Sequence, residues 1–169
     1  MEGIINYVAL GCLALTLILD IVAIALPDWF SALTFSMGLW KFCNLNNNNG
    51  DEICGDITDF YASQGANVPD FFKATRALTI LELILVAIAI EMVVLKIFVM
   101  KDKKFLFLGA SASAISAGGL ILIGTIVFGV KAVEEYTTDA LLGAGFGLGV
   151  VAGVIPIVAG IIFIIGRNK

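Results

Sequence analysis

Four long apolar segments dominate the pattern of hydrophobic and polar positions along the chain. They cover residues 4–27, 76–100, 105–130 and 141–166. A helix rises about 1.5 Å per residue, so about 20 apolar residues are needed to cross the hydrocarbon core of a bilayer. Each segment meets that length. The pattern therefore predicts four transmembrane helices in a single membrane domain that spans residues 1–169.

Polar segments separate the apolar ones, and their charges differ in sign. Residues 101–104 and the tail at 167–169 are basic, whereas residues 28–75 and 131–140 are acidic. Lys and Arg close to helix ends mark the cytoplasmic side of a membrane. We therefore expect a multi-pass plasma-membrane protein with both termini in the cytoplasm. Residues 28–75 and 131–140 would then form the first and second extracellular loops, and residues 101–104 a cytoplasmic turn.

The first apolar segment could also be read as a cleaved signal peptide. A signal peptide has a basic leader and a shorter apolar region. Here the leader carries Glu2, the apolar segment is long, and Asp20 lies inside it. These features favour a transmembrane helix.

Two cysteines in the first predicted extracellular loop suggest a bridged hairpin. Cys43 and Cys54 flank the segment 46–50, which reads Asn-Asn-Asn-Asn-Gly, and Asn-Gly is a strong hairpin signal. Residues 39–42 and 57–60 alternate apolar and polar positions as strands do. In an oxidising compartment the two thiols would form a disulfide, which would stabilise the fold by about 3 kcal/mol. Free thiols, or metal ligation without further partners, remain the alternatives, and Cys12 is expected to pack as a small apolar residue.

The composition agrees with a membrane protein and argues against an enzyme. Hydrophobic residues make up 60% of the 169 residues, charged residues only 14%, and the mean hydropathy is +1.03. The chain has no histidine, which removes the commonest general base and the commonest metal ligand. The acidic pair Asp51-Glu52 lacks the spacing of a calcium loop. We expect no catalytic residues, no cofactor, no metal and no nucleic-acid partner; the expected partners are the lipid bilayer and other membrane proteins.

Three carboxylates lie inside the predicted spans, at Asp20, Glu82 and Glu91. A carboxylate at the bilayer centre costs about 3 kcal/mol on insertion scales. We therefore expect these groups to face the protein interior or to be neutral. Asp20 and Glu82 lie at similar depth and could share a proton if their helices face each other, whereas Glu91 lies near the opposite helix face. Contact with a partner helix, or an ion path, is the functional alternative.

Small residues recur at four-residue spacing in the last two predicted helices. The series are Gly109, Ser113, Ala117 and Gly145, Gly149, Gly153. Such spacing lets helix backbones approach closely. We expect it to serve packing within one bundle, with contact between neighbouring protomers as the alternative.

Several residues taken together resemble the signature of a known family. Trp29, the triplet Gly38-Leu39-Trp40, and then Cys43 and Cys54 resemble the W–GLW–C–C signature of the claudin superfamily, and Arg76 is similar to the arginine at the start of its second helix. The superfamily includes claudins, peripheral myelin protein, epithelial membrane proteins, the lens fibre membrane protein and gamma-type channel subunits. The resemblance covers the whole chain. It implies an all-α membrane protein with a small extracellular antiparallel β-sheet, namely a claudin-like left-handed bundle of four transmembrane helices.

The resemblance also implies what the protein does, in two versions. The first is a non-enzymatic role in cell–cell contact or membrane organisation through the extracellular sheet. The second is an auxiliary, gamma-type subunit of an ion channel or receptor. The protein partner would accordingly be a second copy, an adhesion partner or a channel subunit. The short interval from Trp29 to Trp40 is similar to that of the peripheral myelin and epithelial membrane proteins.

Overall fold

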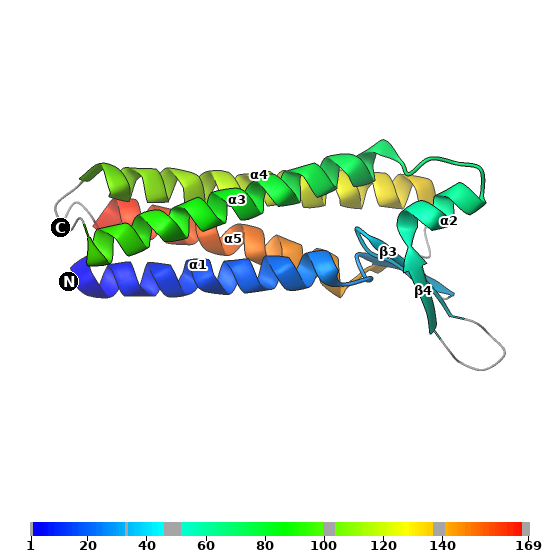
Figure 1. Cartoon of the computed structure of the whole chain (residues 1–169), viewed down its shortest axis with the longest axis horizontal. Coiled ribbons are helices and arrows are strands. Elements are labelled where there is room, and N and C mark those ends of the chain that lie inside the picture. Colours follow the sequence, from blue (N-terminus) through cyan, green and yellow to red (C-terminus); the bar gives the residue numbers. More distant parts are fainter. Residues whose placement is uncertain (1, 33, 46–51, 100–103, 137–140, 167–169) are drawn as a thin grey trace.

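The computed structural model describes residues 2–32, 34–45, 52–99, 104–136 and 141–166. Four long helices lie side by side (Figure 1): α1 Glu2–Ala25, α3 Asp70–Phe98, α4 Lys104–Tyr136 and α5 Ala144–Gly166. All four are long and apolar enough to cross a membrane. α1 begins and α5 ends at the same end of the bundle, which we call the terminus end. A small sheet lies at the other end, the sheet end (Figure 1).

The helices differ in their bounds from the predicted spans. α3 begins at Asp70 instead of residue 76, directly after Pro69, and Phe71 and Phe72 pack on Phe128 of α4. α4 continues to Tyr136, beyond the predicted end at residue 130. Hydropathy marks the part of a helix that lipid surrounds, whereas the added turns at the start of α3 are held by protein packing. Residues 101–103 of the predicted turn, residues 137–140 of the predicted second loop and the tail lie outside the described residues.

The sheet has five antiparallel strands, and one of them comes from the second loop. The strands are β1 Phe30–Ser31, β2 Phe35–Met37, β3 Lys41–Leu45, β4 Glu52–Asp56 and β5 Leu141–Leu142. Their order is β4-β3-β2-β1-β5, so β4 and β5 form the two edges. The hydropathy pattern assigns residues 141 and 142 to the fourth helix. They instead pair with β1, with Leu142 opposite Phe30 and Leu141 opposite Ser31.

The predicted hairpin around the cysteines is present, but its second strand ends earlier than expected. β3 and β4 pair with Cys43 directly opposite Cys54, while residues 46–50 of the turn lie outside the described part. The prediction of a strand at residues 57–60 was wrong, since α2 spans Ile57–Ser63. Asp56 caps this helix by accepting a hydrogen bond from the Thr58 backbone N–H at 2.7 Å. Ile57 and Tyr61, one helical turn apart, are both buried. An alternation of apolar and polar residues over only four positions could not distinguish the helical period from that of a strand.

Two groups of buried side chains form the core, one at each end of the molecule. The group at the sheet end is aromatic and joins the sheet to α3 and α4; it includes Trp29, Phe30, Phe72 and Phe128. The group toward the terminus end is smaller and joins α1, α3, α4 and α5; it includes Leu13, Val93, Phe107 and Phe163. Phe107 and Phe163 meet edge to face across α4 and α5.

Small residues allow α4 and α5 to approach within the bundle. A Cβ atom at Gly153 would come within 2.7 Å of the Leu122 side chain. A Cβ at Gly160 would meet Ile115 at 2.7 Å. At Gly118, a Cβ would overlap the Gly153 carbonyl oxygen. Gly118, Gly153 and Gly160 therefore serve packing inside one chain, as was predicted for the series that contains Gly153.

Candidate functional site

The junction between sheet and bundle is built around Trp29. Its indole Nε1 donates a hydrogen bond to the Ala23 carbonyl oxygen at 2.6 Å, which ties the chain after α1 back to that helix. The ring meets Phe128 of α4 and Phe146 of α5 edge to face, with centroids 5.2 and 6.3 Å away. Trp29 is fully buried. This one side chain therefore joins three helices beneath the sheet.

The triplet Gly38-Leu39-Trp40 forms the second part of the junction. Gly38 packs against the end of α1 so closely that a Cβ would come within 2.7 Å of the Pro27 Cα. The fully buried Leu39 accepts a hydrogen bond at its carbonyl oxygen from Arg76 Nε at 2.7 Å. The Arg76 guanidinium also lies over the Trp40 ring, 4.4 Å from its centroid. Arg76 of α3 thus connects this helix to the segment between β2 and β3.

Asp28 links the two loops, a role that sequence reasoning missed. Its Oδ2 accepts a hydrogen bond from the Ala144 backbone N–H at the start of α5, at 3.1 Å. The Asp28 carbonyl oxygen accepts another from the Gly145 N–H at 2.7 Å. A Cβ at Gly145 would meet the Trp29 ring at 2.6 Å. An Asp next to Trp29 and a Gly pair at 143 and 145 were the only sequence signals, and neither indicates a partner so distant along the chain.

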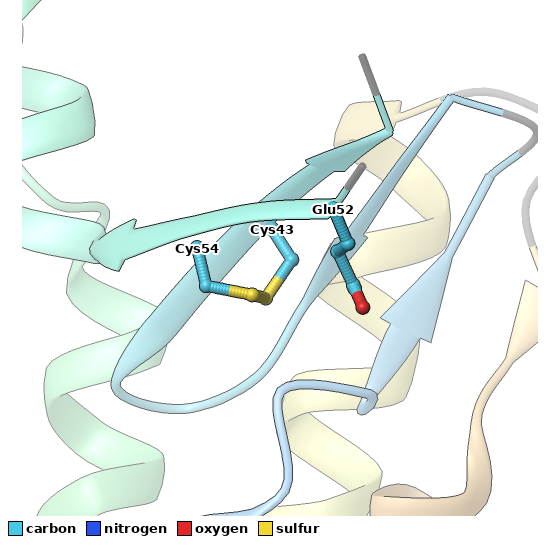
Figure 2. Close-up of side chains that lie close together, drawn as sticks. All are labelled: Cys43, Glu52 and Cys54. Carbon is cyan, nitrogen blue, oxygen red and sulfur yellow. A yellow bond between two sulfur atoms is a disulfide. The ribbon is translucent and has the colours of Figure 1, made fainter. Parts of the chain in front are cut away.

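The predicted disulfide joins Cys43 of β3 and Cys54 of β4, and Cys12 stays free and half-buried in α1. Figure 2 shows the Glu52 side chain on the same side of the hairpin as the bridge. The two sulfur atoms and a Glu52 carboxylate oxygen lie within 4.8 Å of one another. A metal would need thiolates, and both sulfurs are consumed by the bridge. The cluster is therefore a covalent staple of the hairpin.

Asp20 of α1 and Glu82 of α3 meet inside the bundle. Both side chains are fully buried, and their carboxyl groups lie close enough to interact electrostatically. None of their four oxygens accepts a hydrogen bond from another described group. Two ionised carboxylates at this range in a medium of low dielectric constant would repel strongly. The arrangement therefore requires a proton or another positive charge between the two groups.

The bundle interior also holds buried hydroxyl groups, which the sequence analysis did not single out. They belong to Thr16, Thr75, Thr79, Ser111 and Thr125. Thr75 Oγ1 donates to the Gly124 carbonyl oxygen of α4 at 3.3 Å, which links two helices. Thr16 and Thr79 donate to carbonyl oxygens of their own helices. The missed signal was spacing: Thr16 lies four residues before Asp20, and Thr79 lies three residues before Glu82.

Glu91 differs from the other two intramembrane acids. Of the two alternatives expected for these acids, an interior position is wrong for this residue, because its side chain is exposed on α3. A neutral group stays a prediction. Glu91 follows Glu82 by nine residues, and at 3.6 residues per turn that interval places it on the opposite face of the helix. The helix rotation that buries Glu82 thus turns Glu91 outward.

Comparison with known proteins agrees with this architecture. The sequence profile of the PMP-22/EMP/MP20/Claudin family matches residues 4–163. The comparison with individual curated proteins found no match. The matched region includes nearly all of the four helices that could span a membrane, together with the five-stranded sheet and the bridged hairpin. The chain therefore belongs to the PMP-22/EMP/MP20/Claudin family.

Proposed function

We propose that this protein acts without enzymatic chemistry in cell–cell contact or membrane organisation, with the sheet as its contact surface. It would lie in the plasma membrane with the sheet outside and both termini in the cytoplasm. The observation that carries this proposal is the edge strand β4. All five of its residues are exposed, and Ile53 is exposed by 61%. An unpaired strand edge with a projecting apolar side chain is a surface to which another chain can bind.

The construction of the junction supports the same proposal. Trp29 and Arg76 hold the sheet to the bundle, and the disulfide joins its strands β3 and β4, so that little conformational entropy would be lost when a partner binds the edge. A sequence without histidine supports the non-enzymatic part of the proposal. The family match supports a membrane protein of this kind without naming the partner.

A second candidate function is an auxiliary subunit of a channel or receptor, and Glu91 favours it. A carboxylate on the outer face of a spanning helix costs about 3 kcal/mol when lipid surrounds it. Contact with a polar group of a partner helix would lower that cost. Glu91 is therefore the position at which a membrane-embedded partner would bind.

Affinity purification from native membranes in mild detergent separates the two candidates. For cell contact, we expect the chain itself or adhesion proteins to co-purify in near-stoichiometric amounts. Ile53→Ser should reduce their recovery, whereas Leu141→Ser, a change at an exposed apolar position on the opposite edge strand β5, serves as the matched control. Recovery of a pore-forming subunit, lost in Glu91→Leu but unchanged in Ile53→Ser, would replace the first candidate by the second.

The proposed orientation has its own test. Asp51→Thr creates a glycosylation sequon, Asn-Gly-Thr, that begins at Asn49 in the predicted extracellular loop. We expect an expressed, glycosylated product whose mass falls after enzymatic removal of the glycan. An expressed but unmodified product would contradict an outward-facing sheet.

A further inference from the structure

Two hollows meet at Lys41, at the sheet end of the bundle. The larger one, which we call the α1–α3 groove, has a volume of about 370 Å³. Its walls are Ile21, Ile24 and Ala25 of α1 and Leu83 of α3, with Trp40 and Lys41 above them. The smaller hollow has a volume of about 250 Å³ and is lined by Lys41, Cys54, Gly55 and Asp56. An apolar recess between two spanning helices therefore adjoins a smaller hollow on the sheet, with Lys41 lining both.

The smaller hollow presents one positive and one negative side chain, Lys41 and Asp56. Lys41 and Asp56 lie directly opposite on β3 and β4, and both are exposed. The ion pairs found among the described residues join Lys73 to Asp70 and Lys131 to Glu134, not these two. The Thr58 backbone N–H that hydrogen-bonds to Asp56 holds the pKa of that carboxyl below its ordinary value. Arg76 also lowers the pKa of this carboxyl, so Asp56 stays charged at neutral pH and remains exposed on the sheet.

The depth of the groove matches the boundary between acyl chains and headgroups. α1 ends at Ala25, so Ile24 and Ala25 belong to its last turn. Trp40 lies just beyond that end and is 39% exposed. Tryptophan rings collect at membrane–water interfaces. With the bilayer boundary at the end of α1, the apolar walls would face the acyl-chain region, and Lys41 and Asp56 would lie at the level of the headgroups.

We propose that the α1–α3 groove binds a zwitterionic phospholipid from the leaflet on the sheet side. One acyl chain would lie along Ile21, Ile24 and Leu83, the phosphate beside Lys41, and the quaternary ammonium beside Asp56. A choline headgroup carries a negative phosphate and a positive ammonium, which match the positive Lys41 and the negative Asp56. An anionic phospholipid would place its phosphate at Lys41 but would bring no cation of its own to Asp56. The site depends on the geometry of the groove and not on the proposed role in cell contact.

Tryptophan fluorescence provides the test, because the chain has only two tryptophans. Trp29 is fully buried, whereas Trp40 lines the groove. The full chain in mild detergent is titrated with phosphatidylcholine brominated on its acyl chains, or with phosphatidylglycerol brominated on the same chains. Bromine quenches a nearby indole, and Trp40→Phe reports the residual signal of Trp29. We expect saturable quenching of Trp40 at lower mole fractions of phosphatidylcholine than of phosphatidylglycerol.

Three variants examine the headgroup contacts. Asp56→Asn, which keeps a side chain able to cap α2, should reduce the preference for phosphatidylcholine by about two- to fivefold. Lys41→Ala should weaken the binding of both lipids by a similar factor. Lys73→Ala is the matched control, because Lys73 is paired with Asp70 and does not line the groove. Thermal unfolding of each variant verifies its fold.

Several outcomes would overturn the proposal. Equal quenching of wild-type Trp40 by the two lipids would show that the groove does not distinguish their headgroups, and this comparison needs no variant. Lys41→Ala and Asp56→Asn proteins that behave like Lys73→Ala would exclude both contacts. A co-purified protein that shields Trp40 from both brominated lipids would show that a partner, and not a lipid, occupies the groove.

Discussion

The junction beneath the sheet and the carboxyl pair in the bundle interior are both buried, yet their polar groups are used differently. At the junction, Trp29 Nε1 and Arg76 Nε donate to backbone carbonyl oxygens and so join separate segments of the chain. In the interior, the carboxyl groups of Asp20 and Glu82 have only each other among the described groups. A satisfied buried hydrogen bond stabilises a fold, whereas a buried pair of like acids does not. The junction therefore holds the molecule together, and the pair contributes little to its stability.

The largest expected effect is that of Trp29→Ala. It removes a fully buried ring from contact with Phe128 and Phe146, together with the hydrogen bond to Ala23. We expect a loss of about 3–5 kcal/mol in the free energy of unfolding. Thermal unfolding in detergent measures it, with Trp40→Phe as the matched control. A comparable loss in both variants would show that the two tryptophans contribute equally.

Arg76→Gln should have an intermediate effect. It removes the hydrogen bond to the Leu39 carbonyl oxygen and the contact with the Trp40 ring, and leaves a buried carbonyl without its donor. We expect a loss of about 1–3 kcal/mol, measured by the same unfolding experiment. Arg76→Lys keeps the charge but not the Nε donor, so it should be destabilised as well. A lysine variant as stable as the wild type would assign the effect to charge alone.

Replacing both interior acids by their amides should change stability little. In the double variant Asp20→Asn, Glu82→Gln, side chains of nearly the same shape can hydrogen-bond without any charge. We expect an unfolding free energy within about 1 kcal/mol of the wild type, or higher. A loss similar to that of Trp29→Ala would contradict the comparison between the two regions. Unchanged trafficking and partner recovery in Glu82→Gln would exclude a functional role for its charge.

The smallest expected effect is the pH dependence from Asp56 on the surface. The hydrogen bond from the Thr58 N–H lowers the pKa of this carboxyl below its ordinary value of 3.8. Its contribution to stability is present at neutral pH and is lost as the pH falls through that lowered pKa. Asp56→Asn should flatten this part of the pH profile of thermal unfolding below about pH 4. An identical profile in the variant would show that Asp56 makes no such contribution.

Much of the junction could be predicted from the sequence, but its geometry could not. Trp29, the Gly38-Leu39-Trp40 triplet and Arg76 were recognisable as a motif, and Cys43 and Cys54 as a bridged hairpin. The motif did not reveal that Arg76 donates to Leu39 or that Asp28 caps α5. Both contacts join residues far apart along the chain, and local patterns carry no signal for such pairs.

The sequence by itself determined the four spanning helices and the bridged hairpin, because length, hydropathy and turn residues act over neighbouring positions. Only the tertiary structure decided which helix faces met, and so buried Glu82 against Asp20 while exposing Glu91. It also decided that residues 57–63 form a helix and that residues 141 and 142 complete the sheet. Helix rotation and strand pairing follow from packing between distant segments, and a periodicity that fits two elements is settled only when that packing forms.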